Sequence, residues 1–395
     1  MSISAIILLL FIGYVIFTLD KIKEKIPVPP LLVLIGIGLY FVPYFSVIEV
    51  TETMIYHVFL PVLLFTSAYH FSPSSLKKNA GIIGFLASIG LMLTVIILGV
   101  LIYALGSMFL PLSFIGALLI ASILTPTDPV SVVSILQKSS KDQMLAEVVE
   151  GESLINDGTS IVIFSVILGI YLNDTSFSVG GFLGEFFYVS LGGIIIGVLV
   201  GWIFSKAVHF THHREYQVML SIIVAYGIFH LAEHFGFSGV LATVFAGIVL
   251  SYEFGRSIKE DHFRESLDGF WDIVEISILS LLFLLIGIEA AGHLSFHYWG
   301  LAVLIFMASI VVRFIIITGS IKLFPAWRHS ISWRKATLIS WSGLKGSMSV
   351  FLILSLSAQN TANADVLISL TFAAVLLSLV IQSIGIYPLS KKLLK

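Results

Sequence analysis

The chain has 395 residues, of which 58% are hydrophobic and only 11% are charged, and its mean hydropathy is +1.05. Soluble globular domains carry about 25% charged residues, so this composition excludes a soluble protein. The formal net charge of −2 and the lack of a basic tract give no indication of nucleic-acid binding, and the absence of cysteine excludes disulfides, thiolate catalysis and cysteine-bound metal.

Apolar stretches of about 20 residues, the length of a membrane-crossing helix, recur from one end of the chain to the other. The first has no basic segment before it and no small-residue cleavage site, so we expect a retained helix and not a signal peptide. The pattern predicts an all-α polytopic membrane protein with about thirteen transmembrane helices. The expected spans are 3–19, 29–45, 53–71, 80–105, 111–136, 148–172, 182–210, 216–235, 238–252, 269–291, 298–324, 334–357 and 366–389.

The distribution of basic residues supports this assignment and orients the chain. All 21 lysines and arginines except Arg313 and Lys345 fall in alternate loops or at the helix ends beside them. Because cytoplasmic loops are rich in lysine and arginine, these loops are predicted to be cytoplasmic. We therefore expect the N-terminus outside, the C-terminus in the cytoplasm, and an integral protein of the plasma membrane with no soluble regulatory domain.

The fifth span contains two prolines, Pro126 and Pro129, on either side of Thr127 and Asp128. Proline removes a backbone donor and breaks or bends a helix. Within a membrane, unwound backbone is tolerated only where it lines a cavity or is buried in protein. The motif thus predicts an interrupted helix with a carboxylate at the interruption.

The sixth span carries Glu152-Ser153-Leu154-Ile155-Asn156-Asp157. A charged side chain at the bilayer centre costs roughly 2.5 to 3.5 kcal/mol, so such residues mark ion or proton paths. At 1.5 Å per residue, Asp157 lies about 14 Å from the cytoplasmic end, near the midplane. Glu150 precedes Asp157 by seven residues and shares its helix face, so we expect it in a cytoplasmic funnel that attracts cations.

Arg313 in the eleventh span and Lys345 in the twelfth have similar central depths, and Gly343 and Gly346 weaken the twelfth helix beside the lysine. If spans 1–6 and 8–13 are inverted repeats, with span 7 as the linker, the fifth span corresponds to the twelfth. Interrupted helices at matching positions of inverted repeats indicate a transport site.

A count of the buried charges predicts the stoichiometry of transport. Asp128, Glu152 and Asp157 supply three negative charges, whereas Arg313 and Lys345 supply two positive charges. One monovalent cation or one proton would neutralise the remaining negative charge. The sequence therefore predicts one-for-one exchange without net movement of charge.

These motifs resemble those of the sodium/proton exchanger (NHE/NhaP-type) family of monovalent cation:proton antiporters. The resemblance rests on Thr127-Asp128-Pro129, on Glu152-Ser153-x-x-Asn156-Asp157, on Arg313 and on Gly343-Leu344-Lys345-Gly346, and it extends over the whole chain. It implies a homodimer, crossed discontinuous helices 5 and 12, and elevator-type alternating access. Asn156-Asp157 in place of paired aspartates resembles the electroneutral branch, whereas Lys345 departs from the more usual arginine.

The resemblance also implies a division of the chain into two parts. Residues 1–75 and 215–292 would form the dimerisation part, and the helix at 182–210 would be the linker. Residues 80–172 and 298–389 would form the core that transports the ion.

The resemblance assigns six residues to ion or proton binding, namely Asp157, Asp128, Ser153, Thr127, Glu152 and Asn156. Na⁺ would be held at Asp157, Asp128, Ser153 and the main-chain carbonyl of Thr127. Glu152 would pair with Arg313, and Arg313 and Lys345 would compensate charge. No cofactor is expected; the transported species would be H⁺ and Na⁺, with Li⁺ or K⁺ as other possible cations, and the partners are the bilayer and a second copy of the chain.

Several alternatives stay open at this point. K⁺ could replace Na⁺ in the same mechanism, Asp128 could only compensate helix N-termini, and Lys345 could only neutralise helix C-terminal carbonyls. An ion channel is a more distant alternative. His230-Leu231-Ala232-Glu233-His234 fits a pattern of intramembrane zinc hydrolases, although no third ligand is evident. Glu275, near the cytoplasmic end of the tenth span, is left without a role.

Overall fold

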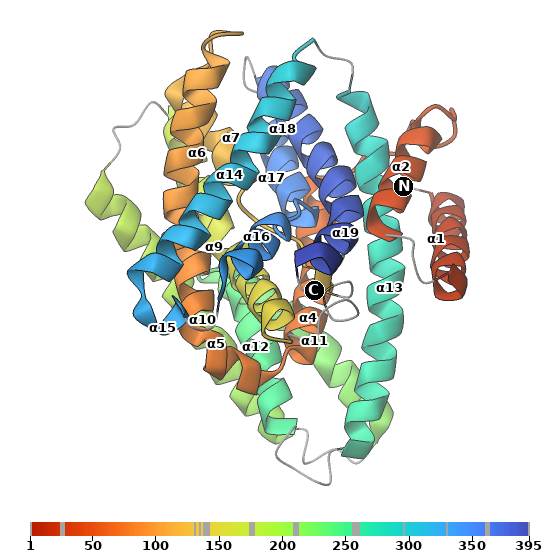
Figure 1. The fold of residues 1–395 in the computed structure, drawn as a ribbon. Coiled ribbons are helices and arrows are strands. Elements are labelled where there is room, and N and C mark those ends of the chain that lie inside the picture. Colours follow the sequence, from red (N-terminus) through yellow and green to blue (C-terminus); the bar gives the residue numbers. More distant parts are fainter. Residues whose placement is uncertain are drawn as a thin grey trace.

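The computed structural model describes the chain in eleven segments, and within them every regular element is helical and none is a strand (Figure 1). This confirms the predicted all-α fold. The described segments are 2–23, 28–129, 132–133, 136, 143–173, 178–207, 213–254, 261–294, 297–328, 331–359 and 364–393.

The helices follow the predicted apolar stretches along the chain. The first half contains α1 (Ile3–Lys23), α2 (Val28–Tyr40), α3 (Glu52–Met54), η1 (Ile55–Phe59), α4 (Leu60–His70), α5 (Pro73–Phe85), η2 (Leu86–Gly90), α6 (Leu91–Gly106), α7 (Phe114–Ile123), α9 (Gln143–Asn173) and α10 (Val179–Ala207). The second half contains α11 (Arg214–His234), α12 (Gly239–Phe254), α13 (Asp261–Gly292), α14 (Trp299–Leu323), α15 (Pro325–Arg328), α16 (Trp333–Trp341), α17 (Ser347–Ala358), α18 (Ala364–Leu377), η5 (Ser378–Gln382) and α19 (Ser383–Leu393).

Among the described residues, eight helices are long and apolar enough to cross a membrane, and four shorter apolar helices accompany them. Large hydrophobic side chains are exposed on their outer faces, notably on α1 and α10, as expected of surfaces that face lipid. The protein is thus an integral multi-pass membrane protein. The count of thirteen spans remains a prediction, because some predicted spans correspond to helices of fewer than 18 residues or to helices with a non-helical break.

The two predicted interruptions are present and face each other. The helix α7 ends at Ile123, and the chain through the two prolines is not helical up to residue 129. The predicted twelfth span likewise consists of α16 and α17, with a break between Trp341 and Ser347. The backbone amide of Asp128 donates to the carbonyl of Leu344 at 2.8 Å, so each break supplies a hydrogen-bond partner that the other lacks.

The helix α9 runs beside this crossing. It packs against α5, η2 and α7, and the hydroxyl of Thr159 donates to the carbonyl of Ala87 in η2 at 2.6 Å. A π-helical turn leaves a carbonyl without its ordinary helical partner, and here a neighbouring helix supplies the donor. This contact fixes the depth of α9 relative to the continuous helix formed by α5, η2 and α6.

A second packing group lies beside this one, with α1 at its edge next to α2 and α13 (Figure 1). The helices α2 and α13 approach closely because glycines meet there. A β-carbon added to Gly36 would lie 2.2 Å from the carbonyl oxygen of Leu284 and 2.9 Å from the α-carbon of Gly287. Only glycine allows two backbones to come this near.

We expect Gly36→Ala to destabilise the protein, because the added methyl group must push α2 away from α13. Overpacking of this kind typically lowers the free energy of unfolding by about 1–3 kcal/mol. Thermal unfolding of the purified protein in detergent measures the effect. Gly38→Ala is the matched control, since nothing lies within 4 Å of its added β-carbon. Equal unfolding temperatures for the two variants would contradict the close contact.

Candidate functional site

Asp157 lies on α9 with one carboxylate oxygen, Oδ1, buried and without a hydrogen-bond partner among the described residues. A cavity of about 40 Å³ lies beside it, lined also by Thr127, Asp128 and Gly346. The wall contributed by α4 and α13 is apolar except for Ser67, and its leucines are Leu60, Leu63, Leu64 and Leu279. A buried polar atom without a partner is costly, and the cavity is large enough for an ion or water. The site therefore offers an unsatisfied carboxylate to a small cation or a proton.

Thr127 and α9 are joined by a dense set of hydrogen bonds. The Ser153 hydroxyl donates to the Thr127 carbonyl, and the two hydroxyl oxygens are 3.2 Å apart. The Asn156 side chain donates to the Thr127 hydroxyl at 2.9 Å and accepts from the Thr127 amide at 3.5 Å. These contacts hold the unwound part of the fifth span against α9. They also place the Thr127 carbonyl and the Ser153 hydroxyl, both predicted ligands, in contact with each other.

Asp128 is 8% exposed and packs against the backbone of Gly346. A β-carbon at Gly346 would lie 2.2 Å from Oδ2 of Asp128, so only glycine fits there. Gly346 directly precedes α17, whose N-terminal end carries partial positive charge. Asp128 also interacts electrostatically with Asp157. Its position therefore suits both of its predicted roles, as a ligand in the cavity and as a compensator of the helix end.

Glu152 and Arg313 form a bidentate ion pair across 161 residues of sequence, with distances of 2.9 Å from Nη1 to Oε1 and 2.5 Å from Nη2 to Oε2. Glu152 is 2% exposed. The guanidinium also donates to the Ile339 carbonyl at 3.4 Å and lies on Gly343, where a β-carbon would be 2.5 Å from Nε. Both oxygens of Glu152 are thus engaged by arginine, which leaves it poorly placed to hold a transported cation.

Lys345 is buried and lies on the other side of α9 from the Asp157 cavity. It lines a cavity of about 20 Å³ together with Glu152, Arg313 and Thr125. Its backbone amide donates to the Ser378 hydroxyl at 3.0 Å. The five predicted charges are therefore divided between two compartments, with both aspartates in one and Glu152 with the two basic residues in the other.

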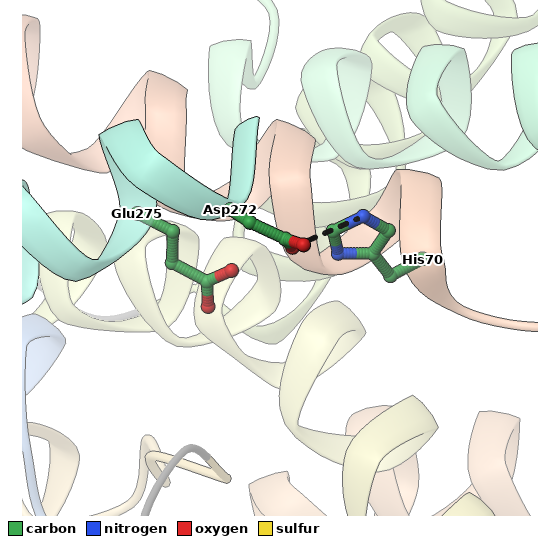
Figure 2. Close-up of side chains that lie close together, drawn as sticks. All are labelled: His70, Asp272 and Glu275. Carbon is green, nitrogen blue, oxygen red and sulfur yellow. Dashed lines mark ion pairs between the residues drawn. The ribbon is translucent and has the colours of Figure 1, made fainter. Parts of the chain in front are cut away.

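Glu150 lies near the N-terminal end of α9, which is its predicted cytoplasmic end, and is half-buried. It interacts electrostatically with Glu147 on its own helix and with Glu275 on α13. His70, at the end of α4, lies close to Asp272 and Glu275, and its Nε2 is 3.8 Å from Oδ1 of Asp272 (Figure 2). Glu275 has no role predicted from the sequence, and His70 and Asp272 are not among the predicted site residues. The only sequence signal for them was the helical spacing of acids on α13.

The histidine motif on α11 does not assemble into a metal site. Oε1 of Glu233 accepts hydrogen bonds from the Tyr56 hydroxyl at 2.9 Å and from the Gly239 amide at 2.8 Å. His230 stacks on His57, with ring centroids 5.2 Å apart. Over the part of the chain that the structure describes, the one group with the spacing of metal ligands is His70, Asp272 and Glu275. The structure thus gives no support to a zinc hydrolase at this motif.

Comparisons with known proteins place the chain among similar proteins over nearly its whole length. The family model for the transmembrane sodium/hydrogen exchanger matches residues 6–392. The chain is 32% identical over 405 residues to the Na⁺/H⁺ antiporter NhaH of Halobacillus dabanensis, covering 98% of this chain and 97% of the relative. It is 33% identical to the Na⁺/H⁺ antiporter NhaG of Bacillus atrophaeus, covering 94% and 71%. The solved structure of the sodium proton antiporter MjNhaP1 from Methanocaldococcus jannaschii superposes with a TM-score of 0.77 at 22% identity, covering 99% and 98%.

We expect Arg313→Ala to destabilise the protein strongly, because Glu152 would remain as a buried charge without its partner. Removal of one member of a buried ion pair typically lowers the free energy of unfolding by about 3–5 kcal/mol. Thermal unfolding in detergent measures the loss. Arg334→Ala removes an exposed arginine and is the control. If the two variants unfold at the same temperature, the buried pair does not stabilise the fold.

Proposed function

The chain belongs to the sodium/hydrogen exchanger family, and on this premise we propose that it is an electroneutral Na⁺/H⁺ antiporter that exchanges one Na⁺ for one H⁺ at Asp157. It is a membrane transporter and not an enzyme. The choice of Na⁺ is supported by the names of the relatives, both of which are Na⁺/H⁺ antiporters. The observation that carries the site is the buried, unpartnered oxygen of Asp157 beside a cavity.

Oxygen ligands from four residues would hold the cation. Carboxylate, hydroxyl and carbonyl oxygens suit hard cations, and Asp157, Asp128, Thr127 and Ser153 supply these groups around or next to one cavity. The Ser153 hydroxyl donates its proton to the Thr127 carbonyl, and both oxygens keep lone pairs that could contact a cation. Asn156 would hold Thr127 in place beside the cation through its two hydrogen bonds.

The competition between the two ions follows from the same carboxylate. When Asp157 is ionised, the two buried compartments together carry one more negative than positive charge. Either Na⁺ or a proton neutralises that excess, and both together would leave an uncompensated positive charge at membrane depth. The loaded forms of the core then carry the same charge in both directions, so exchange would not respond to the membrane potential.

Alternating access would come from movement of the core against the dimerisation part. The wall that α4 and α13 contribute to the Asp157 cavity consists mainly of leucines, with Ser67 as its polar lining residue, so it offers few hydrogen bonds that would resist sliding. On the other side of the site, Tyr56 stacks on Phe351 with ring centroids 4.4 Å apart, and the Ser355 hydroxyl donates to Glu52 at 2.7 Å. These contacts join the two parts and would have to break when the site opens on that side.

The first helix packs mainly along α2 and α13, and much of its apolar surface is exposed. We propose that residues 1–75 and 215–292 form the interface of a homodimer in the plasma membrane. The N-terminus would lie outside and the C-terminus in the cytoplasm, as the distribution of basic residues indicates.

Asp157→Asn is expected to abolish exchange without unfolding the protein, because the amide can neither release a proton nor carry a negative charge. Proteoliposomes with a lumenal pH dye, pulsed with Na⁺, Li⁺ or K⁺, measure this directly. Wild-type alkalinisation should follow Na⁺ and should be the same with and without a valinomycin-clamped potential. If K⁺ alone drives proton flux, the transported cation is K⁺ and not Na⁺. A rate of exchange that depends on voltage would contradict one-for-one exchange. Unchanged proton flux in Asp157→Asn would show that Asp157 does not take part in the mechanism.

Cross-linking Glu52→Cys to Ser355→Cys should stop exchange, because it would tie α3 to α17 across the moving boundary. The chain has no natural cysteine, so a bifunctional thiol reagent would act on these two positions alone. Reduction of a cleavable cross-link should restore transport. Lys206→Cys with Glu253→Cys is the control, since this ion pair of 3.3 Å joins α10 to α12 outside the core. Transport that continues in the fully cross-linked Glu52/Ser355 variant would contradict the elevator movement.

A further inference from the structure

Three potential metal ligands meet at the end of the funnel that faces the predicted cytoplasm. His70 is the last residue of α4, whereas Asp272 and Glu275 project from α13 (Figure 2). One ligand atom from each lies within 4.8 Å of the others. We propose that these side chains form a site for a divalent transition-metal ion, separate from the transport site at Asp157.

The distances around the imidazole fit a shared ion better than direct hydrogen bonds. Nε2 of His70 lies 3.8 Å from Oδ1 of Asp272 and 3.8 Å from Oδ1 of Asp268, beyond the range of a hydrogen bond. Ligands about 2.0–2.2 Å from a tetrahedral metal stand roughly 3.4 Å apart. A small rotation of these side chains would bring their ligand atoms onto one ion.

The position of the acids on α13 explains why they converge. Residues 268, 272 and 275 are spaced by four and then three positions, so they lie on one face of the helix. The end of α4 places an imidazole opposite that face. The result is a mixed set of one nitrogen and several oxygens, contributed by two helices that both belong to the proposed dimerisation part.

The charge around Glu275 points to a cation independently of these distances. This half-buried carboxylate has no hydrogen bond or ion pair among the described residues, and the charges that act on it most are those of Asp272 and Asp128. Glu150 approaches it from α9. Several carboxylates therefore lie in this region. Among the described side chains near them, His70 is the group that can carry a positive charge. A divalent ion would supply the missing positive charge.

The ligand set selects the class of metal. Calcium and magnesium prefer oxygen ligands alone, whereas imidazole together with carboxylate suits Mn²⁺ and Zn²⁺. The ion would bind α4 and α13 without fastening the core, because neither helix belongs to the proposed core.

A consequence for transport rests on the proposed function. Because Glu275 interacts with Asp128, a bound divalent ion would reduce the negative potential that draws Na⁺ toward the site. The metal should then raise the apparent KM for Na⁺ on the cytoplasmic side and leave the maximal rate nearly unchanged.

Binding is tested on the full-length purified protein with Mn²⁺ alone, by the loss of the free-ion signal in electron paramagnetic resonance. We expect one saturable site per chain, with affinity reduced at least about tenfold in His70→Ala and in Asp272→Asn. His293→Ala is the matched control, since His293 pairs with Glu289 at 3.7 Å near the other end of the same helix. Thermal unfolding verifies that each variant is folded. Absence of saturable binding, or binding that survives both substitutions, would overturn the site.

The inhibitory role is tested in proteoliposomes with Mn²⁺ added to the compartment that faces the cytoplasmic side. Wild-type exchange should require more Na⁺ for half-maximal rate, and His70→Ala should be insensitive to the metal while its rate without metal is unchanged. If the protein binds Mn²⁺ but its half-maximal Na⁺ concentration does not change, the inhibitory role is overturned. The binding experiment does not depend on transport, so failure of the antiporter proposal would leave the metal site to be decided by that experiment.

Discussion

The hydrogen bond from the Asp128 amide to the Leu344 carbonyl joins two broken helices, and the geometry of the site depends on this junction. Unwound backbone inside a membrane protein must find partners within the protein, because lipid offers none. Here an amide of one break meets a carbonyl of the other, and Asp128 is set at the start of α17. Without this crossing, neither the Thr127 carbonyl nor the Asp128 carboxylate would lie beside Asp157.

The helix α9 divides the buried charges into two compartments with different tasks. On one side, Glu152 and Arg313 neutralise each other in a bidentate pair, with Lys345 nearby. On the other, Asp157 has an oxygen without a partner and Asp128 beside it. This separation keeps the arginine away from the carboxylate that would exchange ions. The ion pair joins α9 to α14, and the second compartment keeps a carboxylate oxygen without a partner.

Irregular helices around the site serve to position it. The π-helical turn η2 receives a hydrogen bond from Thr159 on α9, and η5 places Ser378 against the Lys345 amide. Gln382 at the end of η5 exchanges hydrogen bonds of 2.7 and 3.0 Å with Trp341, where the twelfth span breaks. Each departure from regular helix thus has a partner on a neighbouring element. The proposed moving boundary, by contrast, is lined on one side mainly by leucines, together with Ser67.

The all-α membrane fold and the two helix interruptions could be predicted from the sequence alone, because hydropathy and proline sterics act locally along the chain. The depth of Glu152 and Asp157 in the membrane stays a prediction from the helical rise. The pairing of Glu152 with Arg313 and the use of Thr127 came from the family resemblance, since local spacing cannot relate residues 161 positions apart. Only the tertiary structure decided that Lys345 and Asp157 occupy different cavities, and that His70 meets Asp272 and Glu275. Those contacts depend on how separate helices pack, which no periodicity within a single helix encodes.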